Sequence, residues 1–198
     1  MARLFIVRHG NTFDKGDTIL RVGGRTDLSL STSGELQAAA LGTHFSDLGI
    51  APARIIAGPL KRTVQTATAI SEALGGPAPV IDERLREIDY GPDEGKPEED
   101  VIARIGREAM DAWERKSHVP DGWRVDPPAL VDMWKDQLAA LAETDEDLMA
   151  VTSNGIARFV LQVIAITTDV PLKLRTGAYG VIERTGNQVH LTEWDVRP

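Results

Sequence analysis

Near its start the sequence reads Arg3-Leu4-Phe5-Ile6-Val7-Arg8-His9-Gly10. The apolar run from Leu4 to Val7 has no polar alternation, which is typical of a strand buried on both faces of a parallel sheet. We therefore expect a strand over Arg3–Val7 that ends at Arg8. Open α/β sheets bind their ligands at the carboxyl ends of the strands. This position makes the Arg-His-Gly tripeptide the first candidate for a functional site.

Strand-like and helix-like segments alternate along the rest of the chain, after a polar loop over 11–30. Such alternation implies parallel βαβ units with helices on both faces of the sheet. We therefore predict an α/β fold: a three-layer αβα sandwich with a mostly parallel sheet. The expected strands are Arg54–Ala57, Val80–Ile81, Leu148–Thr152, Gly177–Glu183 and Gln188–Trp194, the last two as a hairpin through Gly186-Asn187 or an adjacent pair. The expected helices are Glu35–Asp47, Lys61–Leu74, Asp100–Lys116, Ala129–Glu143 and Gly155–Thr167.

The middle of the chain differs from the rest in composition. Proline, glycine and acidic residues make Gly91–Glu99 and Val119–Pro128 irregular. We expect an inserted lid region over about 92–128. Because no internal repeat or long linker divides the chain, we expect a single domain over 1–198.

The composition narrows the classes of function. With 42% hydrophobic and 26% charged residues, the 198-residue chain is close to a soluble globular average. It has no cysteine, which excludes disulfide scaffolds, zinc–thiolate sites and cysteine nucleophiles. Its net charge of −8 disfavours nucleic acid and anionic lipid as partners, so positive charge for an anionic substrate must be local. No apolar run approaches the ~18 residues of a membrane span, and none near the start suits a signal peptide, so we expect a cytoplasmic protein.

Three further segments carry polar residues at expected strand ends or beside apolar ones. Arg62 lies in the first turn of a helix, where a cation opposes the helix dipole by about 0.3–1 kcal/mol unless an anion lies between them; the alternative is a surface arginine. Glu87 precedes the apolar Ile88, where burial would raise its pKa and suit a general acid; the alternative is a solvated acidic loop. Ser153-Asn154-Gly155 follows a strand, either as a phosphate cradle or as an ordinary helix cap.

Together these segments resemble the histidine phosphatase superfamily, the phosphoglycerate-mutase-like fold. The resemblance lies in Arg8-His9-Gly10, in Gly24-Arg25-Thr26-Asp27 and the helix after it, and in the segments 60–67 and 85–91. It implies a phosphohistidine mechanism with no metal or other cofactor. The roles implied are His9 as nucleophile, Glu87 as proton donor, Arg8, Arg62, Ser153 and Asn154 as phosphate-binding residues, and Asn11 and Arg25 as residues of the substrate pocket. For His9 to attack, its other ring nitrogen must donate a hydrogen bond, and a backbone carbonyl is the expected acceptor.

One position departs from the family pattern. The resemblance implies a second histidine at position 153, in contact with the transferring phosphoryl group, and this chain has Ser153 there. The remaining histidines are His44, His118 and His190. Loss of one preorganised donor in such a site costs on the order of 10²–10³ in rate. Two hypotheses follow: a weakened phosphatase acting on a small phosphorylated metabolite, or a non-catalytic pseudo-enzyme that binds a phosphate ligand.

Overall fold

A six-stranded sheet forms the centre of the protein, with the strand order β3-β2-β4-β1-β5-β6. The computed structural model describes residues 2–164, 170–186 and 188–198. The strands β1 (Ala2–Arg8), β2 (Arg54–Ala57), β3 (Val80–Ile81) and β4 (Leu148–Thr152) run parallel. The strand β5 (Tyr179–Thr185) is antiparallel to β1, and β6 (Gln188–Val196) is antiparallel to β5. The predicted α/β fold with a mostly parallel sheet is confirmed.

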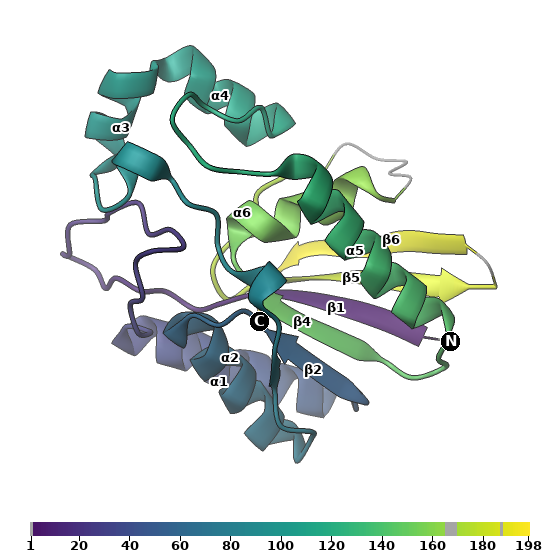
Figure 1. The fold of residues 1–198 in the computed structure, drawn as a ribbon. Helices are drawn as coiled ribbons and strands as arrows, with labels where there is room; N and C mark the ends of the chain where they lie inside the picture. The colour runs from purple at the N-terminus through teal and green to yellow at the C-terminus, as the bar shows by residue number, and fades with distance from the viewer. Residues whose placement is uncertain (1, 165–169, 187) are drawn as a thin grey trace.

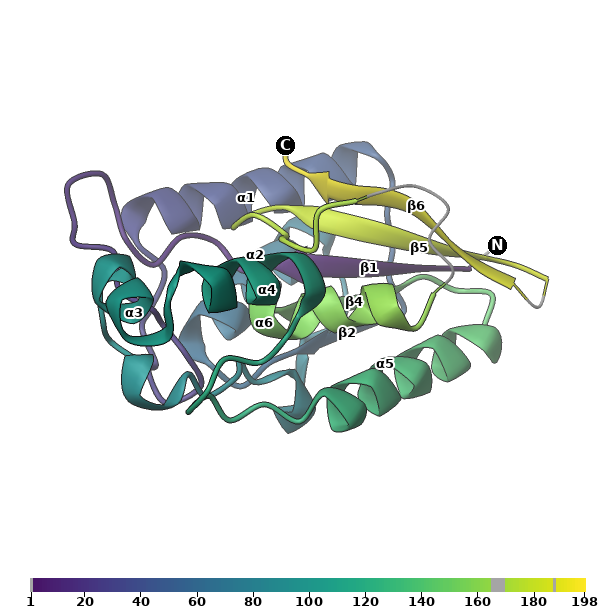
Figure 2. The same cartoon turned by 90° about the horizontal axis from the view of Figure 1, so that it is seen from above.

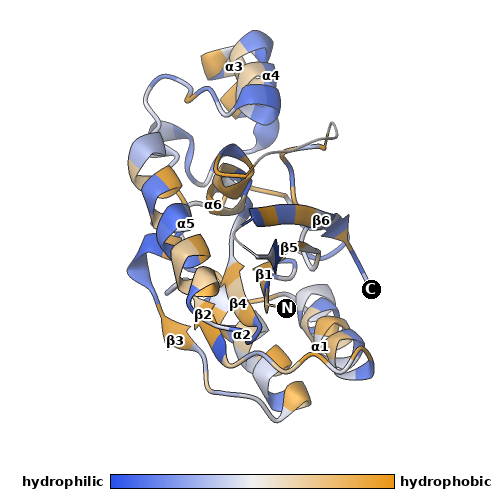
Figure 3. Cartoon of the chain, turned by 90° about the vertical axis from the view of Figure 1, so that its right-hand side faces the viewer, coloured by the Kyte–Doolittle hydropathy of each residue, from blue (hydrophilic) through white to orange (hydrophobic). Residues whose placement is uncertain are grey.

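Helices cover both faces of the sheet (Figures 1 and 3). The helices α1 (Thr32–Asp47) and α2 (Lys61–Leu74) lie on one face, and α5 (Pro127–Ala142) and α6 (Asn154–Ala157) lie on the other. Alternate residues of β1 enter different cores: Phe5 and Val7 pack beneath α1 and α2, whereas Leu4 and Ile6 pack beneath α5. This double burial explains the unbroken apolar run of the strand. The edge strand β6 instead alternates between polar and apolar residues (Figure 3).

The insert forms two helices, α3 (Glu98–Ile105) and α4 (Arg107–Lys116). Our expectation of one helix over Asp100–Lys116 is therefore wrong. Gly106 has φ 86° and ψ 152°, a conformation that glycine adopts readily and that ends an α-helix. In Figures 1 and 2, α3 lies beyond the carboxyl ends of the parallel strands, beside the loop 11–30. A β-bridge between Leu20 and Pro97 joins this loop to the insert.

Other element boundaries differ for local reasons. The helix α5 begins at Pro127, within the segment expected to be irregular. Proline suits the first turn of a helix, because the N–H that it lacks would have no partner there. The helix α6 ends after four residues, and a 3₁₀ helix follows directly over Arg158–Gln162. The expected extension to Thr167 and the hairpin residue Asn187 lie outside the described residues. Within the part of the chain that is described, no helix is both long and apolar enough to cross a membrane.

Trp134 joins α5 to the segment that follows β4. Its side chain is fully buried, and its indole Nε1 donates to the carbonyl of Ile156 at 3.0 Å. We expect Trp134→Ala to lower the free energy of unfolding by about 3–5 kcal/mol, because it leaves a cavity and an unpaired carbonyl. Trp134→Phe, which keeps most of the apolar contact, should cost less. Urea unfolding followed by circular dichroism measures both, and an Ala variant as stable as the parent would contradict this packing.

Candidate active site

The carboxyl ends of three parallel strands meet at one edge of the sheet. The amide of His9 donates to the carbonyl of Thr152 at 3.1 Å, and the amide of Gly58 donates to the carbonyl of Val151 at 3.0 Å. A cavity of about 550 Å³ opens at this edge. Its charged and polar lining consists of Arg8, His9, Asn11, Thr12, Arg21, Arg62, Glu87, Glu98, Glu114, Asn154, Arg158, Lys173 and Thr176, and its aromatic lining of Phe13, Tyr90 and Trp113.

His9 is held in one tautomer. Its Nδ1 lies 2.7 Å from the carbonyl oxygen of Gly10, which can only accept, so Nδ1 carries the hydrogen. The other ring nitrogen, Nε2, accepts from Nε of Arg62 at 3.3 Å. Burial, together with the charges of Arg62 and Arg8, lowers the pKa of His9 well below 6.5. The imidazole is therefore neutral near pH 7, and the lone pair of Nε2 faces a guanidinium.

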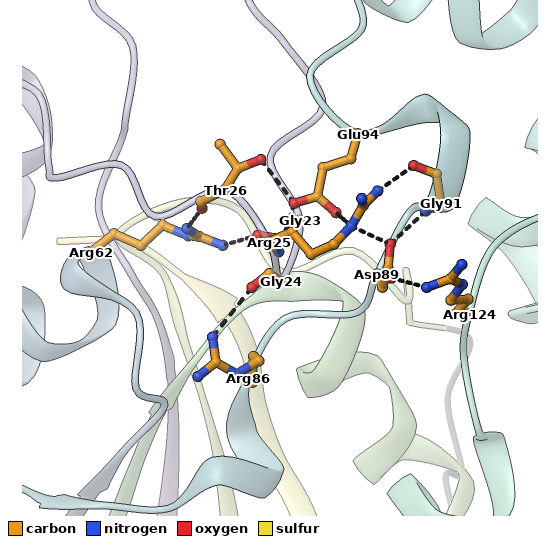
Figure 4. A network of polar contacts seen from close by, with 10 residues as sticks. All are labelled: Gly23, Gly24, Arg25, Thr26, Arg62, Arg86, Asp89, Gly91, Glu94 and Arg124. Carbon is orange, nitrogen blue, oxygen red and sulfur yellow. Dashed lines mark hydrogen bonds and ion pairs between the residues drawn. The ribbon is translucent and has the colours of Figure 1, made fainter.

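Two arginines beside His9 are fixed by backbone carbonyls. Arg62 is 1% exposed, and its Nη1 and Nη2 donate to the carbonyls of Thr26 and Gly23 at 2.8 and 3.3 Å (Figure 4). Arg8 donates from Nη1 to the carbonyl of Leu174 at 2.8 Å, while its buried Nε has no partner among the described residues. A carbonyl orients a guanidinium without neutralising it. Both groups therefore keep their positive charge for an anion.

Glu87 is buried on the same cavity wall. Its Oε1 accepts from the amide of Ile88 at 2.9 Å, and its Oε2 accepts from the amide of Gly155 at 3.3 Å. Burial raises the pKa of Glu87 above 4.5, against the opposing effect of these hydrogen bonds and of the nearby arginines. The low-dielectric surroundings thus favour the protonated form, which can donate a proton.

The segment after β4 places its first two residues differently. Ser153 precedes α6, and its fully buried hydroxyl has no hydrogen-bond partner, in the helix or elsewhere, among the described residues. Ser153 does not line the cavity, whereas Asn154 does. The Oδ1 of Asn154 accepts from the amide of Leu174 at 2.8 Å and so holds the loop before β5.

The two residues expected in the substrate pocket, Asn11 and Arg25, lie in different places. Asn11 lines the cavity, and its Oδ1 accepts from the hydroxyl of Thr176 at 2.5 Å. Arg25 lies outside the cavity wall. Its Nε donates to Asp89 at 3.0 Å and its Nη2 donates to the carbonyl of Gly91 at 2.6 Å (Figure 4).

Sequence reasoning did not assign a role to Arg158, although it lines the cavity. It is 2% exposed, and its guanidinium lies 4.2 Å from the ring centre of Trp113. The available signal was its spacing of four residues from Asn154, which places the two side chains on the same side of a helical turn. His118 is exposed and does not line the cavity.

Comparison with known proteins identifies the family. A sequence model of the histidine phosphatase superfamily (branch 1) matches residues 4–197. The chain belongs to the histidine phosphatase superfamily. Among its relatives in this superfamily is "Probable phosphoglycerate mutase GpmB" of Erwinia tasmaniensis, 30% identical over 180 residues that cover 88% of this chain and 80% of the relative. The protein of the same name from Klebsiella pneumoniae is 33% identical over 163 residues, 79% of this chain and 71% of the relative.

Solved histidine phosphatase-like structures share the fold. A mycobacterial glucosyl-3-phosphoglycerate phosphatase in complex with VO3 superposes with a TM-score of 0.80 at 21% identity and covers 98% of both chains. A phosphoserine phosphatase from Entamoeba histolytica in complex with 3-phosphoglyceric acid gives 0.74 at 17% identity, over 99% of this chain and 98% of the other. At such identities the likeness concerns the fold. The superfamily and its named members together support phosphatase-type activity.

The contact between Gly155 and Glu87 leaves no room for a larger residue. A Cβ at Gly155 would lie 2.2 Å from Oε1 of Glu87, well inside van der Waals contact. We expect Gly155→Ala to displace the Glu87 carboxyl and to lower turnover of an alkyl phosphate by about tenfold or more, since proton donation depends on placement. The matched control is Gly76→Ala, whose added Cβ meets its nearest neighbour at 3.6 Å. Equal activity of the two variants would contradict this role for the contact.

Proposed function

We propose that the chain is a metal-independent phosphatase that hydrolyses a small phosphomonoester through a phosphohistidine at His9. The observation that carries the proposal is the neutral imidazole, whose unprotonated Nε2 lies beside Arg62 at the carboxyl edge of the sheet. Superfamily membership supports the same reaction class. The proposed substrate is a phosphorylated metabolite small enough for a cavity of about 550 Å³.

In the first step, the lone pair of His9 Nε2 forms a bond to phosphorus. The bond between phosphorus and the ester oxygen breaks, and the leaving oxygen takes the proton of Glu87. Arg8 and Arg62 hold the non-bridging oxygens by charge-assisted hydrogen bonds. The products of this step are a free alcohol, a phosphohistidine and an ionised Glu87.

In the second step, water attacks phosphorus and gives a proton to the Glu87 carboxylate. The bond between phosphorus and Nε2 breaks, its electrons return to the imidazole, and inorganic phosphate leaves. Both catalytic groups are then in their starting forms. The insert over 92–128 contributes Glu98, Trp113 and Glu114 to the cavity wall. We propose that it forms the side of the pocket that faces the leaving group.

The intermediate gives the first test of this function. We expect enzyme quenched during turnover to carry a base-stable, acid-labile phosphoryl group on His9, located by mass spectrometry of alkaline-quenched peptides. His9→Ala should lose both the label and the activity. The control is His190→Ala, at an exposed position on β6. Undiminished activity in His9→Ala is the outcome that rules out this mechanism.

The protonation of Glu87 gives a second test. We expect Glu87→Gln to lower kcat/KM for an alkyl phosphate by about 10²–10⁴, and for p-nitrophenyl phosphate by much less, because nitrophenolate leaves without a proton. Since burial raises the pKa of Glu87, wild-type activity on the alkyl ester should persist above pH 4.5 and fall as the pH rises through that raised pKa. Glu87→Gln should lack this fall. Equal losses on the two esters would exclude Glu87 as the proton donor.

The second candidate function is a non-catalytic protein that binds a phosphate ligand. The expected replacement of the family's second histidine by Ser153 favours it, because serine supplies no positive charge and His9 is the one histidine that lines the cavity among the described residues. Calorimetric titration with inorganic phosphate, together with a search for turnover over a panel of phosphomonoesters, separates the two functions. Binding without turnover of any ester would support the second candidate.

A further inference from the structure

Arg158 is a third guanidinium on the wall of the cavity that holds Arg8 and Arg62. It is fixed from two sides: Nη1 donates to the carbonyl of Trp113 at 2.7 Å, and the guanidinium stacks on the Trp113 ring. Its Nε is buried and has no hydrogen-bond partner among the described residues. The side chain is thus rigidly placed while part of its donor capacity is unused.

None of these three arginines forms an ion pair in the described part of the chain, unlike other arginines nearby. Arg21, which lines the same cavity, pairs with Glu98, and Arg104 in the insert pairs with Asp93. A buried cation without an anionic partner is costly, because the lost hydration is not replaced. The buried Arg62 and Arg158 and the half-buried Arg8 line one cavity, which indicates that their partner is an anion that enters it.

Arg158 shares the cavity wall with His9 and Glu87, the two groups proposed to react. Burial lowers the pKa of Arg158, while the charges of Glu87 and Glu114 raise it and the charge of Arg8 lowers it. Glu114 is exposed and forms no ion pair with Arg158 in the described structure.

We propose that Arg158 binds the transferring phosphoryl group together with Arg8 and Arg62. The inference rests on the proposed phosphatase function. A phosphomonoester dianion matches a cavity wall with three guanidiniums that have no carboxylate partner among the described residues. Asn154 and Arg158 line the cavity, whereas the fully buried Ser153 does not.

Orthovanadate tests the assignment because it occupies a phosphoryl site and has no leaving group. We expect Arg158→Met to weaken orthovanadate inhibition by about 10- to 100-fold, the range for loss of a charge-assisted hydrogen bond. Arg158→Lys should lose less, because it keeps the charge without the planar fork. Turnover of p-nitrophenyl phosphate should fall mainly in kcat. The matched control is Arg21→Met, whose guanidinium also contacts aromatic rings but is neutralised by Glu98.

The outcomes separate this inference from the proposed function. If wild-type turnover depends on His9 and Arg158→Met retains wild-type orthovanadate affinity but binds a larger ester more weakly, Arg158 contacts the leaving group and the inference is wrong. Equal losses in Arg158→Met and Arg21→Met would also overturn it, because the charge of the whole cavity would then be responsible. Unfolding midpoints identify a variant that fails to fold, and Arg158→Lys then decides. Wild-type turnover that does not depend on His9 would instead refute the proposed function.

Discussion

Positive charge without a carboxylate partner among the described residues is the constraint around which the site is organised. Arg8, Arg62 and Arg158 each donate to backbone carbonyls rather than to acids. Those carbonyls belong to segments with little regular structure of their own or to the insert: the loop 11–30, the loop before β5 and the end of α4. Each guanidinium therefore does two things. It stays charged, and it fixes the segment whose carbonyl it binds against the edge of the sheet.

The same charges set the protonation states of the two groups proposed to react. Burial acts on both, in opposite directions: it lowers the pKa of His9 and raises the pKa of Glu87, since in each case the neutral form is favoured. The arginines reinforce the effect at His9 and oppose it at Glu87. A neutral base and a neutral acid can thus coexist in one cavity, as nucleophilic attack with proton donation requires.

Element bounds were best predicted where a local pattern of apolar residues corresponds to the residues that are buried in the structure. The bounds of Lys61–Leu74 and Leu148–Thr152 were predicted as they are observed, because helical spacing and a continuous apolar run each match their burial. The helix break at Gly106 depends on one positive φ, which a helical pattern does not reveal. Arg25 and Arg158 show the corresponding limit for the site. Whether an arginine faces a cavity or an acid depends on partners that are distant in the sequence, and spacing alone does not identify them.

The segment after β4 brings a neutral side chain, Asn154, and a charged one, Arg158, to the same cavity. Gly155 packs closely against Glu87, Ser153 is fully buried, and Asn154 and Arg158 line the cavity. The net charge of the chain is −8, so its long-range field does not attract a phosphate ester. Binding must then come from guanidiniums at short range, where low dielectric strengthens each contact. In the role proposed for it, the buried Arg158 adds one such contact to those of Arg8 and Arg62.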